Sequence, residues 1–169
     1  MSRIEVQAYR LLQKAGIARP RVNLNKILRH LGIRRVLRQM PAHLSGALLV
    51  DEKVGPVIGV NSDHPVTRRR FTTAHEIGHY VLHSDKGLHV DKRADVFLRP
   101  TRSGSGGDPA EREANQFAAA LLMPRPFLRR DYELFDEDQF VVAELASRYR
   151  VSPSAMTYRL MNLSLPVIE

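Results

Sequence analysis

His75, Glu76 and His79 form the pattern H-E-x-x-H inside a stretch that we predict to be helical. Positions i and i+4 of an α-helix lie about 40° apart and one turn along the axis, so both imidazoles face the same side. Two imidazole nitrogens in this arrangement can bind one Zn²⁺ at about 2.0–2.1 Å. Glu76 cannot reach that ion as a ligand, but it is placed to accept a proton from a water molecule at the metal. The pattern predicts metal-assisted hydrolysis, although it also occurs by chance in amphipathic helices.

A catalytic zinc needs a third protein ligand, and without cysteine in the chain this ligand must be a histidine or a carboxylate. The downstream candidates are His83, His89, Asp91, Asp95, Asp108, Glu111 and Glu113. In the helix expected over 109–123, the buried stripe consists of Ala114, Phe117, Ala118 and Leu121. Glu111 lies at the edge of this stripe, whereas Glu113 points away, so we choose Glu111. A carboxylate directed towards the core needs a compensating charge, which zinc provides.

Three further residues are candidates for supporting roles around the metal. Asn115 follows Glu111 by one turn and could form a hydrogen bond to a ligand. His83 lies one turn beyond His79, too far along the axis to share the ion. We expect His83 to close the C-terminus of its helix rather than to contact a substrate oxyanion. Tyr80, His83 and a later tyrosine all remain candidates for stabilising the oxyanion.

Two blocks of sequence resemble the ImmA/IrrE family of zinc endopeptidases. They are RFTTAHEIGH at 70–79 and EREANQFAAALLMP at 111–124, and matches to the family pattern extend over nearly the whole chain. The resemblance implies a glutamate as the third ligand, which matches Glu111 by its place relative to Asn115 and the Leu-Met-Pro that follows. It also implies a substrate class, because compact members cleave helix-turn-helix repressors of mobile elements or stress regulons in the cytoplasm.

Length and composition set the expected organisation. We expect the 169 residues to form a single metallopeptidase domain. Residues 1–66 would supply N-terminal helices and a sheet, 67–123 the zinc-binding helices and the loop between them, and 124–169 a helical tail. The N-terminus lacks the apolar core of a signal peptide, and no stretch approaches 18 apolar residues. A cytoplasmic location without membrane contact is the expectation.

The expected fold class is α+β, with a small three-stranded antiparallel sheet packed on a zincin-type metal helix. Helices are predicted over 4–15, 23–32, 67–84, 109–123, 126–134, 137–150 and 153–163, and strands over 33–40, 46–51 and 54–60. Pro56 favours an edge position for the third strand. Thr67 is the predicted N-cap of the metal helix, and Gly78 within it suggests that another element approaches closely. We expect a flexible loop over 85–108, either a lid over the site or a simple connector.

Charge is unevenly distributed along the chain. The net charge is +8, but residues 1–70 carry 14 Lys/Arg and 4 Asp/Glu, giving +10. We expect this basic third to steer a partner. Residues 143–163 read as helix-turn-helix, yet the second helix carries only Arg159 as a cation, so packing or substrate docking is favoured over direct DNA binding. The alternative function is a catalytically silent regulator that binds a repressor or DNA through its basic N-terminal face; the intact Glu76 argues against it. No pattern indicates an oligomeric state.

Overall fold

A computed structural model describes residues 1–83, 87–91, 108–135 and 141–167, apart from the side chains of 87–91. Within them the expected α+β class is confirmed. The elements in chain order are α1 (Arg3–Lys14), α2 (Leu24–Leu31), β1 (Arg34–Arg38), β2 (Gly46–Asp51), β3 (Gly55–Asn61), α3 (Val66–Leu82), β4 (Gly87–Asp91), α4 (Pro109–Leu122), α5 (Arg125–Tyr132), α6 (Val141–Tyr149) and α7 (Pro153–Asn162). No helix in the described part of the chain is long and apolar enough to cross a bilayer.

The sheet differs from the expected three-stranded antiparallel one. Its strand order is β1-β3-β2-β4, with β1 parallel to β3 and the other two pairs antiparallel. The sheet is therefore mixed, and β3 is paired on both sides rather than lying at an edge. The fourth strand, β4, lies in the stretch for which we expected only a loop. Most of that stretch, 92–107, lies outside the described residues.

Two local features accompany the central position of β3. Asn61, fully buried, donates from Nδ2 to the carbonyls of Met40 (3.1 Å) and Leu44 (2.9 Å), and so fixes the connection that carries the chain from β1 past β3 to β2. Pro56 pairs only with Val50 of β2, because the pairing with β1 begins one residue later. The proline therefore avoids the second ladder without lying in an edge strand.

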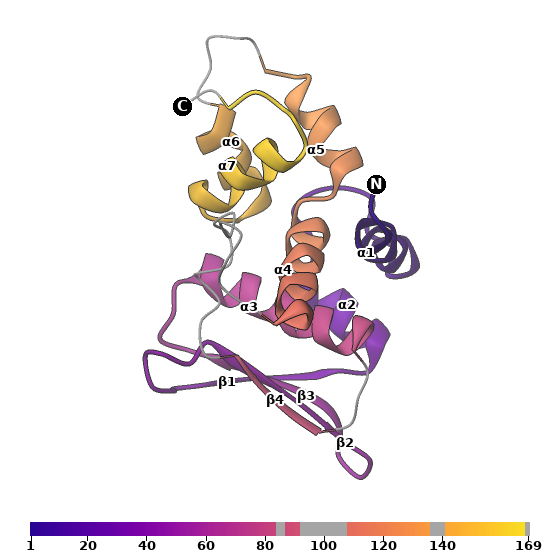
Figure 1. Cartoon of the computed structure of the whole chain (residues 1–169), viewed down its shortest axis with the longest axis vertical. Helices are drawn as coiled ribbons and strands as arrows, with labels where there is room; N and C mark the ends of the chain where they lie inside the picture. Colours follow the sequence, from indigo (N-terminus) through magenta and orange to yellow (C-terminus); the bar gives the residue numbers. More distant parts are fainter. Residues whose placement is uncertain (84–86, 92–107, 136–140, 168–169) are drawn as a thin grey trace.

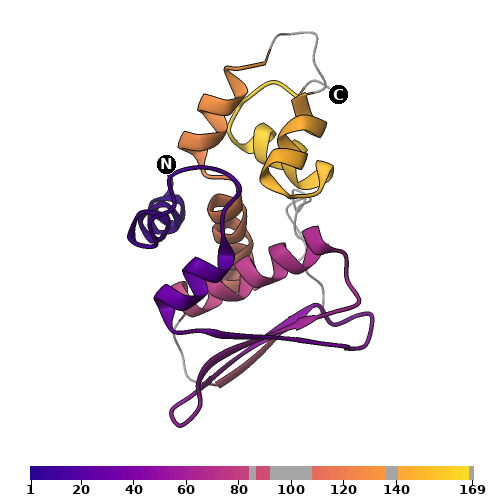
Figure 2. The same cartoon turned by 180° about the vertical axis from the view of Figure 1, so that it is seen from behind.

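Helix α3 lies across one face of the sheet, and α4 crosses α3 on the side away from the sheet (Figures 1 and 2). Gly78 permits this crossing. A Cβ at this position would lie 3.1 Å from both Cα and O of Ala114 and 3.3 Å from Cβ of Phe117. The expected close approach is confirmed, and the approaching element is α4. The predicted Thr67 cap is wrong, since α3 begins at Val66 after Pro65 and has no side-chain cap.

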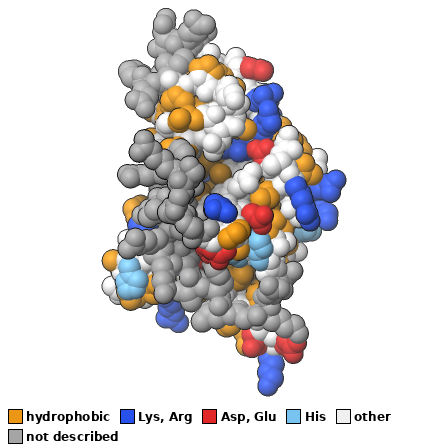
Figure 3. Space-filling model, viewed as in Figure 1, with side chains coloured by type: hydrophobic (Ala, Val, Ile, Leu, Met, Phe, Trp, Pro, Cys, Tyr) orange, Lys and Arg blue, Asp and Glu red, His pale blue; other side chains and the backbone are white. Residues whose placement is uncertain are grey.

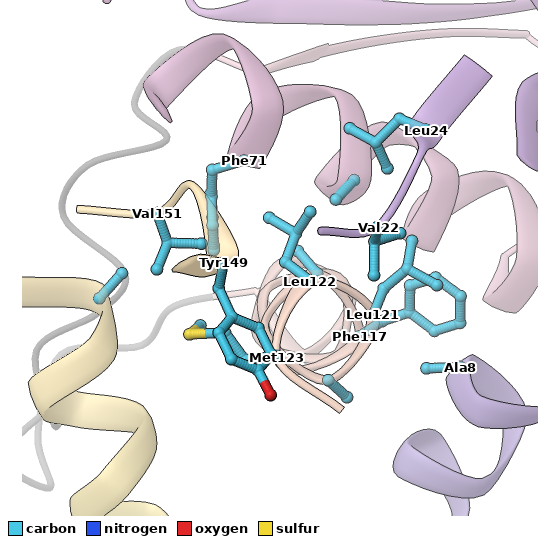
Figure 4. Packing of buried hydrophobic residues seen from close by; sticks show 14 of the residues in the cluster. Ala8, Val22, Leu24, Phe71, Phe117, Leu121, Leu122, Met123, Tyr149 and Val151 are labelled. Atoms are coloured by element: carbon cyan, nitrogen blue, oxygen red, sulfur yellow. The ribbon is translucent and has the colours of Figure 1, made fainter. Parts of the chain in front are cut away.

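Helix α4 is the centre of the hydrophobic core. Figure 4 shows side chains from several parts of the chain around it, including Val22 before α2, Phe71 on α3, and Tyr149 and Val151 from the tail. Because residues distant in sequence meet on α4, the face of α4 that carries Glu111 is held in a fixed orientation towards α3.

A buried ion pair also connects the tail to the N-terminal helix. Arg159 on α7 lies 2.8 Å from a carboxylate oxygen of Glu5 on α1, and its Nε donates to the carbonyl of Met123 at 3.1 Å. Helices α6 and α7 pack on each other across residues 150–152. The helix-turn-helix character of this tail stays a prediction.

Candidate metal centre

His75 and His79 lie on the face of α3 that is turned towards α4. Both are buried, with relative exposures of 0% and 3%. Their rings meet edge to face at 4.6 Å between centroids, and the two Nε2 atoms are 2.9 Å apart. The one-turn spacing thus places two imidazole nitrogens together in a buried site.

Glu111 completes the cluster from the first turn of α4. One of its carboxylate oxygens is 3.3 Å from Nε2 of His75, and the other is 3.3 Å from Nε2 of His79. Three ligands placed tetrahedrally at about 2.0–2.1 Å from one zinc ion are themselves about 3.3 Å apart. The separations and the two-imidazole, one-carboxylate donor set therefore fit a single metal ion. Among the described residues, His75, His79 and Glu111 form the group that could hold one.

Asn115 fixes the orientation of one histidine. Its Oδ1 lies 2.8 Å from Nδ1 of His75, and both side chains are buried. An amide oxygen can only accept, so Nδ1 carries the hydrogen and Nε2 keeps its lone pair for a metal. Asn115 and Glu111 are one turn apart on α4. This helix therefore supplies both the third potential metal ligand, Glu111, and the residue that orients His75.

Glu76 lies on the side of α3 that faces the sheet and is fully buried. Strand β2 passes next to it, because a Cβ on Gly46 would lie 3.4 Å from Oε1 of Glu76 and 2.5 Å from Cγ2 of Thr72. Sequence reasoning missed Gly46. The available signal was a glycine that opens a strand, which often marks a close approach of another element.

The other described candidates do not join this group of potential ligands, although the ring of His83 lies 5.9 Å from that of His79. Nε2 of His83, at the C-terminus of α3, is 3.4 Å from Oε2 of Glu113, and the His83 backbone N–H donates to the carbonyl of His79. Asp108 caps α4 by accepting from the N–H of Ala110 at 2.9 Å. Tyr80 is partly buried against the core. The side chains of His89 and Asp91, and the whole of Asp95, lie outside the described residues.

Comparison with known proteins agrees with this geometry. The family model for the IrrE N-terminal-like domain, Peptidase_M78, matches residues 28–161, which include the whole of α3 and α4. The chain belongs to the IrrE N-terminal-like family. The ImmA/IrrE resemblance of the two sequence blocks is thereby confirmed.

Two relatives of this IrrE-like chain are radiation response metalloproteases IrrE. The protein from Deinococcus radiodurans is 38% identical over 114 residues, covering 66% of this chain and 33% of the relative. The one from Deinococcus deserti is 34% identical over 116 residues, covering 66% and 38%. The chain thus spans about a third of the length of these relatives. A solved structure described as a Mycobacterium tuberculosis transcriptional regulator shares the fold, with a TM-score of 0.64 over 98% of this chain and 49% of that one, at 18% identity.

Proposed function

We propose that this chain is a zinc endopeptidase that hydrolyses a peptide bond in a protein substrate. The observation that carries the proposal is the convergence of His75, His79 and Glu111, with the buried carboxylate of Glu76 on the next residue after His75. The IrrE relatives, which are metalloproteases by name, support it.

Each residue has a separate task in the proposed reaction. His75, His79 and Glu111 would hold the ion, and Asn115 keeps the lone pair of His75 Nε2 directed towards it. When bound, zinc supplies a Lewis acid that polarises the scissile carbonyl and lowers the pKa of water. Glu76 accepts the proton of the attacking water and delivers it to the leaving amine. Its carboxylate is fully buried, and β2 passes next to it at Gly46.

For the substrate we propose a helix-turn-helix transcriptional repressor in the cytoplasm. The support is the resemblance of the blocks at 70–79 and 111–124 to compact ImmA/IrrE proteins. Zinc-loaded protein should cut such a repressor at a defined bond, and mass spectrometry of the fragments would identify the new termini. Glu76→Gln should abolish cutting while retaining zinc and repressor binding. Glu113→Gln is the matched control, because it removes a half-exposed carboxylate of the neighbouring helix.

The possible outcomes separate the proposals. Cutting of unfolded proteins but of no repressor would contradict the substrate class and leave the endopeptidase activity intact. Repressor binding without cutting by zinc-loaded wild type would contradict the endopeptidase and favour the silent regulator. Cutting that persists in Glu76→Gln would contradict the role of Glu76.

A further inference from the structure

Five arginines from separate segments line one pocket on the side of α3 away from the metal ligands. The pocket has a volume of about 400 Å³, and none of the metal-centre residues lines it. Arg69 and Arg70 come from α3, Arg35 from β1, Arg21 from the loop before α2, and Arg150 from the turn between α6 and α7. Figure 2 shows α2 and the chain leading into it lying over α3 on this side.

Hydrogen bonds hold two of the five arginines in place, yet no carboxylate among the described residues balances the charge of any of them. Arg70 donates from Nε to the carbonyl of Arg150 (3.2 Å) and from an NH2 group to the carbonyl of Val22 (3.0 Å), and Arg35 donates to Oδ1 of Asn25 (3.0 Å). These acceptors are neutral. Among the described residues, none of the five arginines forms an ion pair with a carboxylate. On the face shown in Figure 3, by contrast, Lys and Arg side chains lie in small groups, several of them beside acidic ones.

The local electrostatics agree with this geometry. Burial, together with the positive charges of Arg150, Arg21 and Arg35, lowers the pKa of Arg70 to about 10. Burial and the charge of Arg69 lower the pKa of Arg35. Without a ligand, the fold bears the cost of placing like charges close together, and an anion in the pocket would offset it.

The pocket also has features beyond its charge. Its volume lies within the range of small-molecule sites, about 300–1,000 Å³. Apolar residues also line the pocket, namely Val22, Leu24, Leu37 and Val66. All its cations are arginines, whose planar fork binds phosphate through paired hydrogen bonds. A phosphate group carries a charge of about −1.5 to −2 at pH 7, so a few phosphates would match the pocket in both charge and size.

We propose that this arginine pocket binds a small molecule carrying two or more phosphate groups. The ligand would contact α3, the segment before α2, and the turn between α6 and α7. It would thereby link the C-terminal helices to the helix that carries His75. A DNA duplex is too wide to enter a pocket of this size, and a peptide of the same volume carries fewer charges. This inference does not rest on the proposed peptidase activity.

The test is calorimetric titration of the full chain with inorganic pyrophosphate at about 0.15 M salt, where surface attraction is screened beyond about 8 Å. Wild type should bind one equivalent. Arg35→Gln with Arg69→Gln should weaken binding about a hundredfold, taking roughly a factor of ten for each charged hydrogen-bonding partner lost. The matched control, Arg10→Gln with Arg29→Gln, removes the same charge from exposed positions outside the pocket and should change affinity less than threefold.

Folding is checked by thermal melting without ligand. The pocket variant should melt close to the wild-type temperature, because the relief of like-charge repulsion offsets the loss of the exposed hydrogen bond from Arg35 to Asn25. If the double variant does not fold, Arg69→Gln is tested alone, because within the described part of the chain the side chain of Arg69 forms no hydrogen bond that the fold would lose. This variant should weaken binding about tenfold. Equal pyrophosphate affinity in wild type and the pocket variant would overturn the proposal. The proposal would also be overturned if an octa-glutamate peptide or a short DNA duplex bound wild type more tightly than pyrophosphate does and lost this binding in the pocket variant.

Discussion

Replacing Gly46 with alanine should damage the site from the sheet side. The added Cβ would lie 2.5 Å from Cγ2 of Thr72 and 2.9 Å from the carbonyl oxygen of Gly59. Carbon atoms pack best at about 3.5–4.0 Å, so β2 and α3 must separate by a large fraction of an ångström. We expect a loss of about 2–3 kcal/mol in the free energy of unfolding, at the upper end of overpacking costs. Because Glu76 lies against the same point, cleavage should fall about 10–100-fold while zinc remains bound.

Gly59→Ala is the matched control on the neighbouring strand. Its Cβ would meet the terminal methyl of Met40 at 3.2 Å, and the next neighbour, the carbonyl oxygen of Ala47, lies at 3.9 Å. A methionine terminus can rotate away, so the cost should stay below about 1 kcal/mol. Urea denaturation of both variants, with zinc content and cleavage measured on the same samples, makes the comparison. Equal losses of stability in the two variants would refute the claim that the contact at Gly46 is the tight one.

Three further changes follow from contacts within the fold. Asn115→Ala removes the acceptor for Nδ1 of His75 and should weaken zinc binding about 10–100-fold in competition with a chelator; a change below threefold would contradict the orienting role. Burial alone would raise the pKa of Glu5, but the charge and hydrogen bond of Arg159 outweigh it and lower the pKa below its ordinary 4.5. The pair therefore stabilises the fold above about pH 4.5 and loses this contribution as the pH falls through the lowered pKa. In metal-free protein, the urea midpoint of Glu5→Gln should therefore fall less steeply than that of wild type as the pH is lowered. The same dependence on pH in both proteins would count against this. Gly78→Ala gains about 1 kcal/mol of helix propensity but places Cβ 3.1 Å from the backbone of α4, so we expect net destabilisation and weaker zinc binding; a wild-type urea midpoint would show that α4 moves aside freely.

The helices were predictable from the sequence because their signals are local. Asn23 accepts from the N–H groups of Asn25 and Lys26 as the N-cap of α2, and Gly32 ends this helix in the left-handed conformation. The phase of α4 placed Glu111 and Asn115 on one edge, and both lie beside His75. A spacing along one helix is enough to bring such residues to one face.

The sheet order was not predictable, because pairing between strands is a property of distant residues. The pattern of β1 says nothing about whether β2 or β3 lies beside it, and the deciding contacts come from Asn61 to the connection after β1. Thr67 has the chemistry of a cap, but the chain enters α3 directly through Pro65. The arginine pocket was visible in the sequence only as excess charge, since its members come from four separate segments.

Helices α3 and α4 are proposed to hold one zinc ion together, through His75, His79 and Glu111. Zinc content after equilibrium dialysis tests it most directly, in wild type, Glu111→Ala and Glu113→Ala. Glu111 lies 3.3 Å from both histidine nitrogens, whereas Glu113 contacts His83. We predict one zinc per chain in wild type and in Glu113→Ala, and strong depletion in Glu111→Ala. Full occupancy in Glu111→Ala with depletion in Glu113→Ala would contradict the proposed ligand set.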